Sequence, residues 1–289
     1  MSGTDLILER KERKYIVLEH SFDEIISEIE KHIPVYSFLD EPPLTDIETT
    51  YMDTPDFMLF HEYLNQRFFR FKIRLRRYGH EGVFKPEYLA ELKIKQSAIS
   101  SKKRFILPYE SYSAFLQGEN LLPQIKTANY GKIGAQKTYK LIRELIRLNG
   151  LVPVLRTSYE RISFQKNSKR VRITVDHKIT HTGLLGREKK ETLDAVILES
   201  KIMGKSPKWQ KKLVNMLSLM RQVRLSKFIT GLNSIYFPYR GKYNFLSDNK
   251  SVRTDIPDKI LQSLELLNKA FKLNGEIQLG IFQEEVNDD

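Results

Sequence analysis

The chain consists mainly of short segments in which hydrophobic and polar residues alternate, with a few segments of helical spacing between them. Alternation with a period of two predicts strands over 6–17, 67–78, 88–95, 156–165, 170–180 and 194–203, and two short strands within 48–64 around the turn at 53–56. Apolar residues at helical spacing predict helices over 22–32, 134–149, 207 to about 220, and 256–273. Because strand–helix alternation and a Gly-rich turn are lacking, we expect an α+β protein with a mostly antiparallel barrel or sandwich and helices packed outside.

Lys and Arg gather on one face of these strands. In the segment 68–76 the apolar face is Phe69, Phe71, Ile73 and Leu75, and the other face is Arg70, Lys72, Arg74 and Arg76. On one strand alone this pattern is at least as typical of a solvated outer face as of a cation-lined interior. However, the pattern recurs on six strands. Buried cations without partners are very costly, so the recurrence favours charged faces that line a wet interior holding a dense polyanion.

Composition limits the partners of such an interior. The net charge is +12, which indicates an anionic partner, and there are no cysteines, so disulfides and thiolate metal sites are excluded. A metal would therefore have oxygen or imidazole ligands, and oxygen favours Mg²⁺ or Mn²⁺. The charged faces carry few aromatic residues for stacking bases, so we expect no nucleic acid. No apolar run is long enough for a transmembrane helix and no signal peptide is visible, so we expect a cytoplasmic protein without a transmembrane segment of its own.

Ten short motifs along the chain resemble one known family in content and order. They are ERKYIV at 12–17, ETTYMDTPDF at 48–57, FKIRLRRYG at 71–79, AELKIK at 90–95, SKKRF at 101–105, TSYERISF at 157–164, VRITVD at 171–176, VILESKI at 196–202, PKW at 207–209 and RLSKF at 224–228. Together they resemble the catalytic domain of the vacuolar transporter chaperone (VTC) complex, the polyphosphate polymerase branch of the CYTH-like triphosphate tunnel metalloenzymes. We therefore expect a catalytic domain over 1–239 and a C-terminal appendage over 240–289, with one helix and an acidic tail.

The resemblance implies a closed eight-stranded antiparallel β-barrel, a tunnel that holds ATP and polyphosphate, and transfer of the γ-phosphate assisted by Mn²⁺ or Mg²⁺. By position in the motifs, the residues expected to be catalytic are Arg74, Arg76, Lys93, Arg161, Arg172 and Lys227. Those expected to bind substrate are Lys14, Lys72, Lys95, Lys102, Lys103, Lys201, Arg224 and Ser226, with Lys103 preferred and Lys102 a close competitor. Glu199 is the expected metal ligand, while Asp176 is either a second ligand or a turn cap.

Three function classes remain open at this point. The triphosphatase branch usually begins with a Glu-x-Glu-x-Lys strand, whereas this chain has Arg10 in place of the first Glu, followed by Glu12 and Lys14. One carboxylate fewer for a second metal favours an ATP–polyphosphate phosphotransferase. The alternatives are an inorganic triphosphatase or NTPase on the same fold, and a non-catalytic module that binds polyphosphate or inositol phosphate. We also allow for a membrane partner protein that removes the product.

Overall fold

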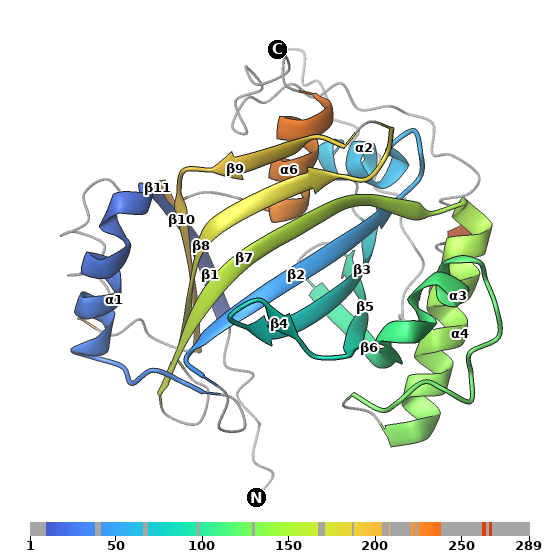
Figure 1. Ribbon diagram of the computed structural model, residues 1–289, viewed down its shortest axis with the longest axis horizontal. Helices are drawn as coiled ribbons and strands as arrows, with labels where there is room; N and C mark the ends of the chain where they lie inside the picture. The colour runs from blue at the N-terminus through green and yellow to red at the C-terminus, as the bar shows by residue number, and fades with distance from the viewer. Residues whose placement is uncertain are drawn as a thin grey trace, which may run out of the picture. The chain divides into compact units, whose positions relative to one another are not determined.

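The protein is described here in a computed structural model (Figure 1). The structure describes residues 10–37, 42–65, 69–96, 99–128, 131–166, 171–186, 188–203, 208, 221–222, 225–237, 262–263 and 266–267. The chain is an α+β protein with a large antiparallel sheet and few helices, as expected. It divides into two compact units, which we call unit 1 (Met1–Thr49, Arg77–Lys85 and Leu155–Phe245) and unit 2 (Thr50–Arg76, Pro86–Val154 and Leu246–Asp289).

Unit 1 is a sheet with one apolar face covered by a helix. Its strands are β1 (Arg10–Val17), β4 (Val83–Phe84), most of β7 (Val152–Lys166), β8 (Val171–Gly183), β9 (Lys190–Leu193), β10 (Val196–Met203) and β11 (Arg221–Gln222). Its helices are η1 (Glu19–Ser21), α1 (Phe22–Glu30) and α6 (Lys227–Tyr236). Ile25 and Ile29 of α1 pack with Tyr15, Val175 and Leu198 of the sheet, all of them buried. This contact explains the amphipathic sequence of α1, because its apolar stripe needs an apolar sheet face to cover.

Unit 2 has its own core between strands and helices. Its elements are α2 (Met58–Leu64), β5 (Glu87–Gln96), β6 (Ile99–Pro108), η2 (Tyr109–Ser111), α3 (Tyr112–Leu116) and α4 (Gly131–Asn149), and the strands β2 (Leu44–Asp53) and β3 (Phe69–His80) have residues in both units. Phe105, Phe115 and Tyr139 stack edge to face or tilted at the centre of the core. Leu267 is also fully buried there, and Ser263 exchanges hydrogen bonds with Asn149 at the end of α4.

The expectation of a closed barrel is wrong for the described residues. The hydrogen-bonded strand order is β11-β1-β10-β8-β7-β2-β3-β5-β6, with β4 on β3 and β9 on β8, so the sheet is open and has β11 and β6 at its edges. Alternation along a strand shows which side chains share a face, but closure depends on pairing between the first and last strands of the order. Local sequence pattern carries no signal for that pairing.

One predicted strand is a helix. The segment 48–64 was expected to hold two strands, but β2 ends at Asp53 and the helix α2 follows from Met58. The Asp53 carboxylate accepts hydrogen bonds from the backbone N–H groups of Leu59 and Phe60, at 2.8 and 3.0 Å, and Thr54 Oγ1 accepts one from Met58. These side chains satisfy the N–H groups at the start of a helix, so the Asp-Thr pair is a helix-start signal here as well as a turn signal.

The remaining predicted elements fall into three groups. The helices over 22–32 and 134–149 and the strands over 67–78, 88–95, 156–165, 170–180 and 194–203 are confirmed, and the strand over 6–17 is confirmed from residue 10. The strands β4, β6, β9 and β11 were not predicted. Apart from residue 208, the helix expected from 207 to about 220 lies outside the described residues, as does most of the one over 256–273. In the part of the chain that the structure describes, no helix combines the length and the apolar character needed to span a membrane.

Candidate functional site

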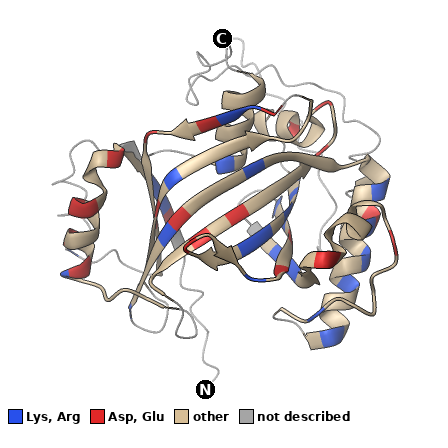
Figure 2. Cartoon of the chain, in the orientation of Figure 1, with Lys and Arg blue, Asp and Glu red and all other residues tan. Residues whose placement is uncertain are grey.

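The expected site residues are distributed between the two units. Those in unit 1 are Lys14, Arg161, Arg172, Glu199, Lys201, Ser226 and Lys227. Those in unit 2 are Lys72, Arg74, Arg76, Lys93, Lys95, Lys102 and Lys103. Arg224 lies outside the described residues. Each unit therefore carries its own cationic array, and Figure 2 shows Lys and Arg positions together with scattered carboxylates on the strands.

Strand register brings the unit 1 residues onto one face of the sheet. Lys14 on β1 lies opposite Glu199 on β10, and in the next row Lys201 on β10 lies opposite Arg172 on β8. Directly opposed residues point to the same face of a sheet, and so do residues two apart on one strand. The four side chains therefore share the face opposite to the one that α1 covers.

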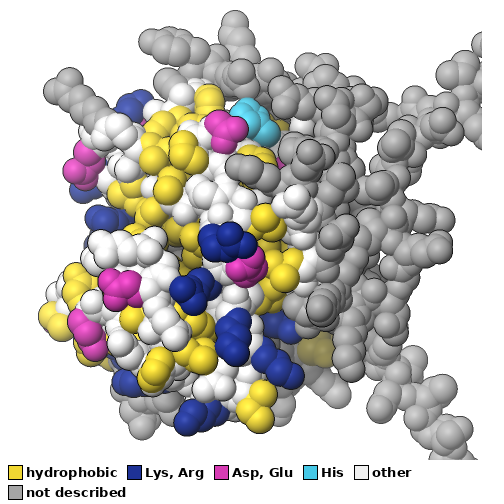
Figure 3. Space-filling view, turned by 90° about the vertical axis from the view of Figure 1, so that its right-hand side faces the viewer, with side chains coloured by type: hydrophobic (Ala, Val, Ile, Leu, Met, Phe, Trp, Pro, Cys, Tyr) yellow, Lys and Arg dark blue, Asp and Glu magenta, His cyan; other side chains and the backbone are white. Residues whose placement is uncertain are grey.

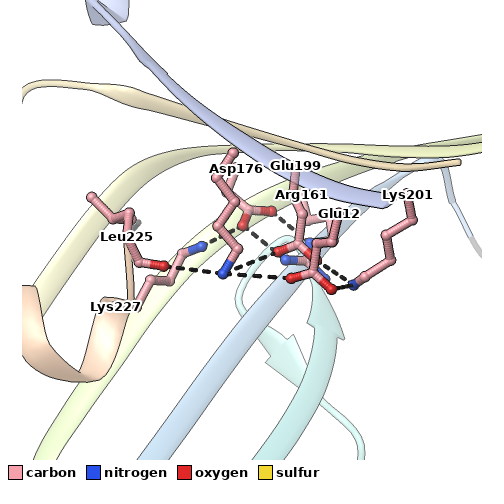
Figure 4. Close-up of polar contacts among 8 residues, drawn as sticks. Glu12, Arg161, Asp176, Glu199, Lys201, Leu225 and Lys227 are labelled. Atoms are coloured by element: carbon pink, nitrogen blue, oxygen red, sulfur yellow. Dashed lines mark hydrogen bonds and ion pairs between the residues drawn. The ribbon is translucent and has the colours of Figure 1, made fainter. Parts of the chain in front are cut away.

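Glu199 is the centre of the first ion-pair cluster. Lys201 Nζ forms a close ion pair with Glu199 Oε1, and Lys14 Nζ lies 3.6 Å from Glu199 Oε2 (Figure 4). Glu12 adds a second carboxylate, with its oxygens 3.8 Å from Lys14 Nζ and 3.9 Å from Lys201 Nζ. Burial alone would raise the pKa of Glu199, but the charges of Lys14 and Lys201 outweigh burial and hold this pKa far below its ordinary value. Glu199 is therefore ionised at neutral pH.

Asp176 is the centre of a second cluster on the same face. Arg161 binds it through two hydrogen bonds, Nε to Oδ1 at 2.5 Å and Nη2 to Oδ2 at 2.8 Å, and Lys227 Nζ contacts Oδ2 at 2.5 Å (Figure 4). Burial would raise the pKa of Asp176, but the charges of Arg161 and Lys227 lower it to about 2. Both cations also lie over the ring of Tyr159. Asp176 therefore orients two expected catalytic cations. It lies inside β8 and so does not cap a turn at a strand end, while its role as a second metal ligand stays a prediction.

The start of α6 is joined to the first cluster through the backbone. Lys14 Nζ donates a hydrogen bond to the Leu225 carbonyl oxygen at 3.0 Å. Ser226 is the N-cap residue of α6, and Lys227 is its first helical residue. The segment 225–227 therefore contributes one carbonyl to Lys14 and one cation to Asp176.

The array in unit 2 is organised around Glu91. Arg74 on β3 and Arg104 on β6 lie directly opposite Glu91 on β5, one on each side. Arg74 Nη2 is 2.6 Å from Glu91 Oε2, and Arg104 Nη2 is 3.7 Å from Oε1. Burial would raise the pKa of Glu91, but the charges of Arg74, Arg76 and Arg104 lower it to about 2. The carboxylate is thus a permanent anion that holds arginines in place.

Three lysines form the neighbouring row. Lys72 on β3, Lys93 on β5 and Lys102 on β6 are direct cross-strand neighbours. Lys95 lies two residues further along β5 on the same face, and Lys72 Nζ is 4.1 Å from the centroid of the Tyr63 ring. Like charges directly opposite each other destabilise a sheet. A row of this kind is favourable when an anion with several charges binds across it.

Register separates the two adjacent lysines of β6. Lys102 lies opposite Lys93 on the cationic face, whereas Lys103 lies opposite Leu92 on the apolar face. Burial and the nearby charge of Lys137, on α4, lower the pKa of Lys103. The structure thus places Lys102, and not the preferred Lys103, with the other expected phosphate-binding residues of unit 2.

Comparison with known proteins identifies the family. The family model of the VTC domain matches residues 9–236. The chain belongs to the VTC domain family. A curated relative, vacuolar transporter chaperone complex subunit 4 of Trypanosoma brucei brucei, is 26% identical over 200 residues, which are 59% of this chain and 25% of the relative. The match therefore spans about a quarter of that protein's length.

Solved structures show weaker likenesses to this VTC domain. The PH1819 protein of Pyrococcus horikoshii OT3 is 14% identical, with a TM-score of 0.45, 78% of this chain covered and 99% of that one. A protein of Vibrio parahaemolyticus described as a candidate adenylate cyclase is 15% identical, with a TM-score of 0.40, 76% of this chain covered and 97% of that one. At these scores the two likenesses support no conclusion about function.

Some site residues of the VTC domain were not singled out from the sequence. Arg104 follows Lys102 by two residues, so the alternation that marked β3 also places Arg104 on the cationic face. Tyr63 contacts both Arg70 and Lys72 by cation–π interaction from the end of α2. The motifs carry no signal for Tyr63, because α2 was not predicted. The Leu225 carbonyl is a backbone group, so its contact with Lys14 depends on chain placement and not on residue type.

The carboxylates of unit 1 fit a metal that arrives with a phosphate ligand. Glu199 and Glu12 share the same two lysines, and among the described residues no three His, Asp or Glu side chains gather to form a protein-only metal site. Mg²⁺ commonly binds through one or two carboxylates and completes its shell with water and substrate phosphates. The two carboxylates are therefore compatible with a divalent ion that takes its other ligands from water and phosphate, and Glu199 as a metal ligand stays a prediction.

Proposed function

We propose that this VTC domain transfers the γ-phosphate of ATP onto a polyphosphate chain. The observation that carries the proposal is the first ion-pair cluster, in which Lys14 and Lys201 bind ionised Glu199 on a face shared with Arg172. These residues all lie within the stretch that matches the family. A carboxylate surrounded by a surplus of cations is suited to phosphate oxygens and a divalent ion together.

The chemistry needs positioning and charge neutralisation more than covalent participation by the protein. The oxygen of the terminal phosphate of the chain attacks the γ-phosphorus in line, a new P–O bond forms, and the bond from γ-phosphorus to the β–γ bridging oxygen breaks to release ADP. Arg161 and Lys227, held by Asp176, would neutralise the oxygens of the transferring group. In unit 2, the lysine row 72, 93 and 102 would bind phosphate as well.

A divalent metal is part of this proposal. Mn²⁺ or Mg²⁺ held by Glu199, with Glu12 as the second carboxylate nearby, would supply positive charge to phosphate oxygens. Lys14 and Lys201 would then turn from the carboxylates towards phosphate, because a lysine is a flexible point charge. The remaining task of the residues is to keep the phosphates aligned.

A phosphohydrolase on the same fold is the second candidate. It would use the same cations and deliver water in place of the chain end. The sequence at the start of β1 favours the transferase, since Arg10 stands where the triphosphatase branch has a Glu. A third candidate is a binding module without turnover, which the absence of catalytic cations would favour, but the sequence retains all the cations expected to be catalytic.

The test is an incubation of the pure chain with ATP and Mn²⁺, followed by gel analysis for long-chain polyphosphate. We expect long chains and ADP in the wild type and neither in Lys93→Gln, purified in parallel so that a contaminating kinase would reveal itself. Release of free phosphate without polyphosphate chains would contradict the transferase and support the hydrolase. Tight binding of polyphosphate without turnover of ATP would contradict both enzymes and support the binding module.

We further propose that the domain works beside a membrane partner. The Trypanosoma relative is by its printed name a subunit of a complex, and this chain matches a quarter of it. A chain of phosphates made next to a membrane protein could be passed on as it grows. Co-purification of the chain with a membrane protein from its own cells would test this.

A further inference from the structure

The solvent face of α4 in unit 2 carries a band of cations that the proposed function does not use. Figure 3 shows Lys and Arg side chains gathered in a band on the side of the molecule that carries α4. The residues of this band, which we call the α4 stripe, are Lys132, Lys137, Lys140, Arg143 and Arg147. Each of them is exposed, whereas Tyr139, Ile142 and Leu145 on the other side of the helix are buried in the core.

The α4 stripe is electrostatically unbalanced. Glu144 is the single carboxylate in the sequence of α4, and it is bound by Arg147 at 2.5 Å. Lys137, Lys140 and Arg143 follow one another at intervals of three residues, a spacing at which like charges repel on a helix. Lys103 adds a sixth cation from β6, close enough to Lys137 for that charge to lower its pKa. A solvated helix face usually mixes signs, so this arrangement favours a polyanionic ligand.

The shape of the α4 stripe distinguishes between polyanions. From residue 132 to residue 147 it extends about 22 Å along the exposed side of the helix, at a rise of 1.5 Å per residue. A membrane surface is usually met by a helix with apolar residues beside its basic ones, and on α4 the apolar residues face the core, except for Ile133. Single-stranded nucleic acid needs exposed aromatic rings for stacking, and Tyr139, the aromatic residue of α4, is buried. A linear chain of phosphates without bases needs neither the apolar contacts of a membrane surface nor the aromatic contacts of single-stranded nucleic acid.

We propose that the α4 stripe, with Lys103, is a second binding surface for an extended inorganic polyphosphate chain, separate from the arrays on the strands. The proposal rests on the proposed function in naming polyphosphate as the anion. Its geometric basis is independent, because all six cations lie within unit 2 and none faces Glu91 or Lys93. Such a surface would hold a long chain without affecting a short one.

The experiment compares a long and a short ligand on the full chain. The variant Lys132→Gln/Lys137→Gln/Lys140→Gln removes three exposed charges of the α4 stripe. The control Lys31→Gln/Lys189→Gln/Lys190→Gln removes three exposed lysines of unit 1. Binding of fluorescent long-chain polyphosphate and of tripolyphosphate is measured at low salt. We expect the stripe variant to bind the long chain roughly tenfold more weakly with tripolyphosphate affinity unchanged, and the control to bind both as the wild type does.

The possible outcomes separate the alternatives. Equal losses in the stripe variant and the control would overturn the proposal, because net charge alone would then explain them, and so would an unchanged affinity for the long chain. Loss of binding to phosphatidylserine vesicles with polyphosphate binding intact would also overturn it, in favour of a membrane surface. The assay needs no turnover, so an inactive wild type that still shows the expected difference would contradict the polymerase proposal and support the α4 stripe.

Discussion

Replacement of Asp176 by asparagine tests the cluster that orients Arg161 and Lys227. The Asp176 side chain is completely buried, and the side chains of Arg161 and Lys227 are only 17% and 12% exposed. Asparagine keeps the size and one oxygen acceptor but removes the negative charge. Two cations then lie close together without the carboxylate that balances them, so we expect a clear loss of stability.

The size of the expected stability loss follows from the pKa of the Asp176 carboxyl group. Burial opposes ionisation, yet the two cations lower the pKa of Asp176 from 3.8 to about 2. A difference of this size corresponds to about 2 kcal/mol in favour of the ionised folded state. Removing one partner of a buried ion pair costs about 3–5 kcal/mol, and the amide oxygen of asparagine offsets part of this, so we expect about 3 kcal/mol. For a domain of this size, that lowers Tm by about 6–12 °C.

The pH dependence has a definite sign. The folded pKa of Asp176 lies below the unfolded value of 3.8, so the contribution of this group is fully present above about pH 4 and is lost as the pH falls towards 2. The wild type and Asp176→Asn should therefore differ most at neutral pH. Their difference should shrink progressively below pH 4.

Thermal unfolding, followed by circular dichroism at several pH values, measures both the loss of stability and its pH dependence. Asp46→Asn is the matched control, because its carboxylate accepts a single backbone N–H from Gly82 at the surface, and we expect a change within about 0.5 kcal/mol. Added tripolyphosphate should raise the Tm of Asp176→Asn by more than that of the wild type, since the two cations would bind the added anion. A Tm of Asp176→Asn within about 2 °C of the wild type would refute the reasoning, because it would mean that Asp176 does not balance the two cations.

Three further predictions concern other carboxylates and lysines. Glu199→Ala should abolish metal-dependent turnover while the far-ultraviolet circular dichroism stays unchanged, and activity at the wild-type level would remove Glu199 from the site. Lys102→Gln should weaken tripolyphosphate binding in calorimetry by roughly fivefold and Lys103→Gln by less than twofold; equal losses would contradict the strand register. Burial raises the pKa of Asp53 to about 7, above its unfolded value, so its contribution to stability should be lost as pH rises from about 4 through 7. The urea midpoint of the wild type should fall as the pH rises over this range, and that of Asp53→Asn should not. The same dependence of the midpoint on pH in both proteins would contradict the prediction.

The faces of the strands could be predicted from sequence because they depend on a local period. Once β3 is a strand, Arg74 and Leu75 must point to opposite faces, and their exposure follows that alternation. The faces of the adjacent lysines 102 and 103 were harder to predict, since the motif SKKR does not indicate which lysine shares the face of Lys93. That choice is fixed by the register of β6 against β5, which depends on the connection between the two strands.

The remaining errors arise from one local contact between a side chain and the backbone, and from interactions between distant residues. The segment 58–64 became a helix because Asp53 binds backbone N–H groups six and seven residues later, an arrangement that apolar spacing alone does not reveal. The open strand order is likewise a matter of pairing between strands far apart in the chain. The role of Asp176 could not be predicted either, because Lys227 comes from a helix 51 residues away.

The three buried or half-buried carboxylates of the arrays differ in how firmly they are held, and this separates positioning from metal binding. Glu91 and Asp176 are each bound by an arginine that donates two hydrogen bonds or close contacts from a planar guanidinium. Such a pair has fixed geometry, so neither carboxylate is readily given up to a metal. Glu199 is bound by two lysines, whose flexible stems let the ammonium groups move to a phosphate without breaking a planar fork. Among these three carboxylates, Glu199 is therefore the one whose partners can be exchanged for a metal when phosphate binds.

Replacement of Glu91 by glutamine tests this difference. Glu91→Gln should lower the affinity for tripolyphosphate without changing the metal concentration needed for half-maximal turnover. A shift in that metal requirement in Glu91→Gln would show that Glu91, too, exchanges its arginines for the ion.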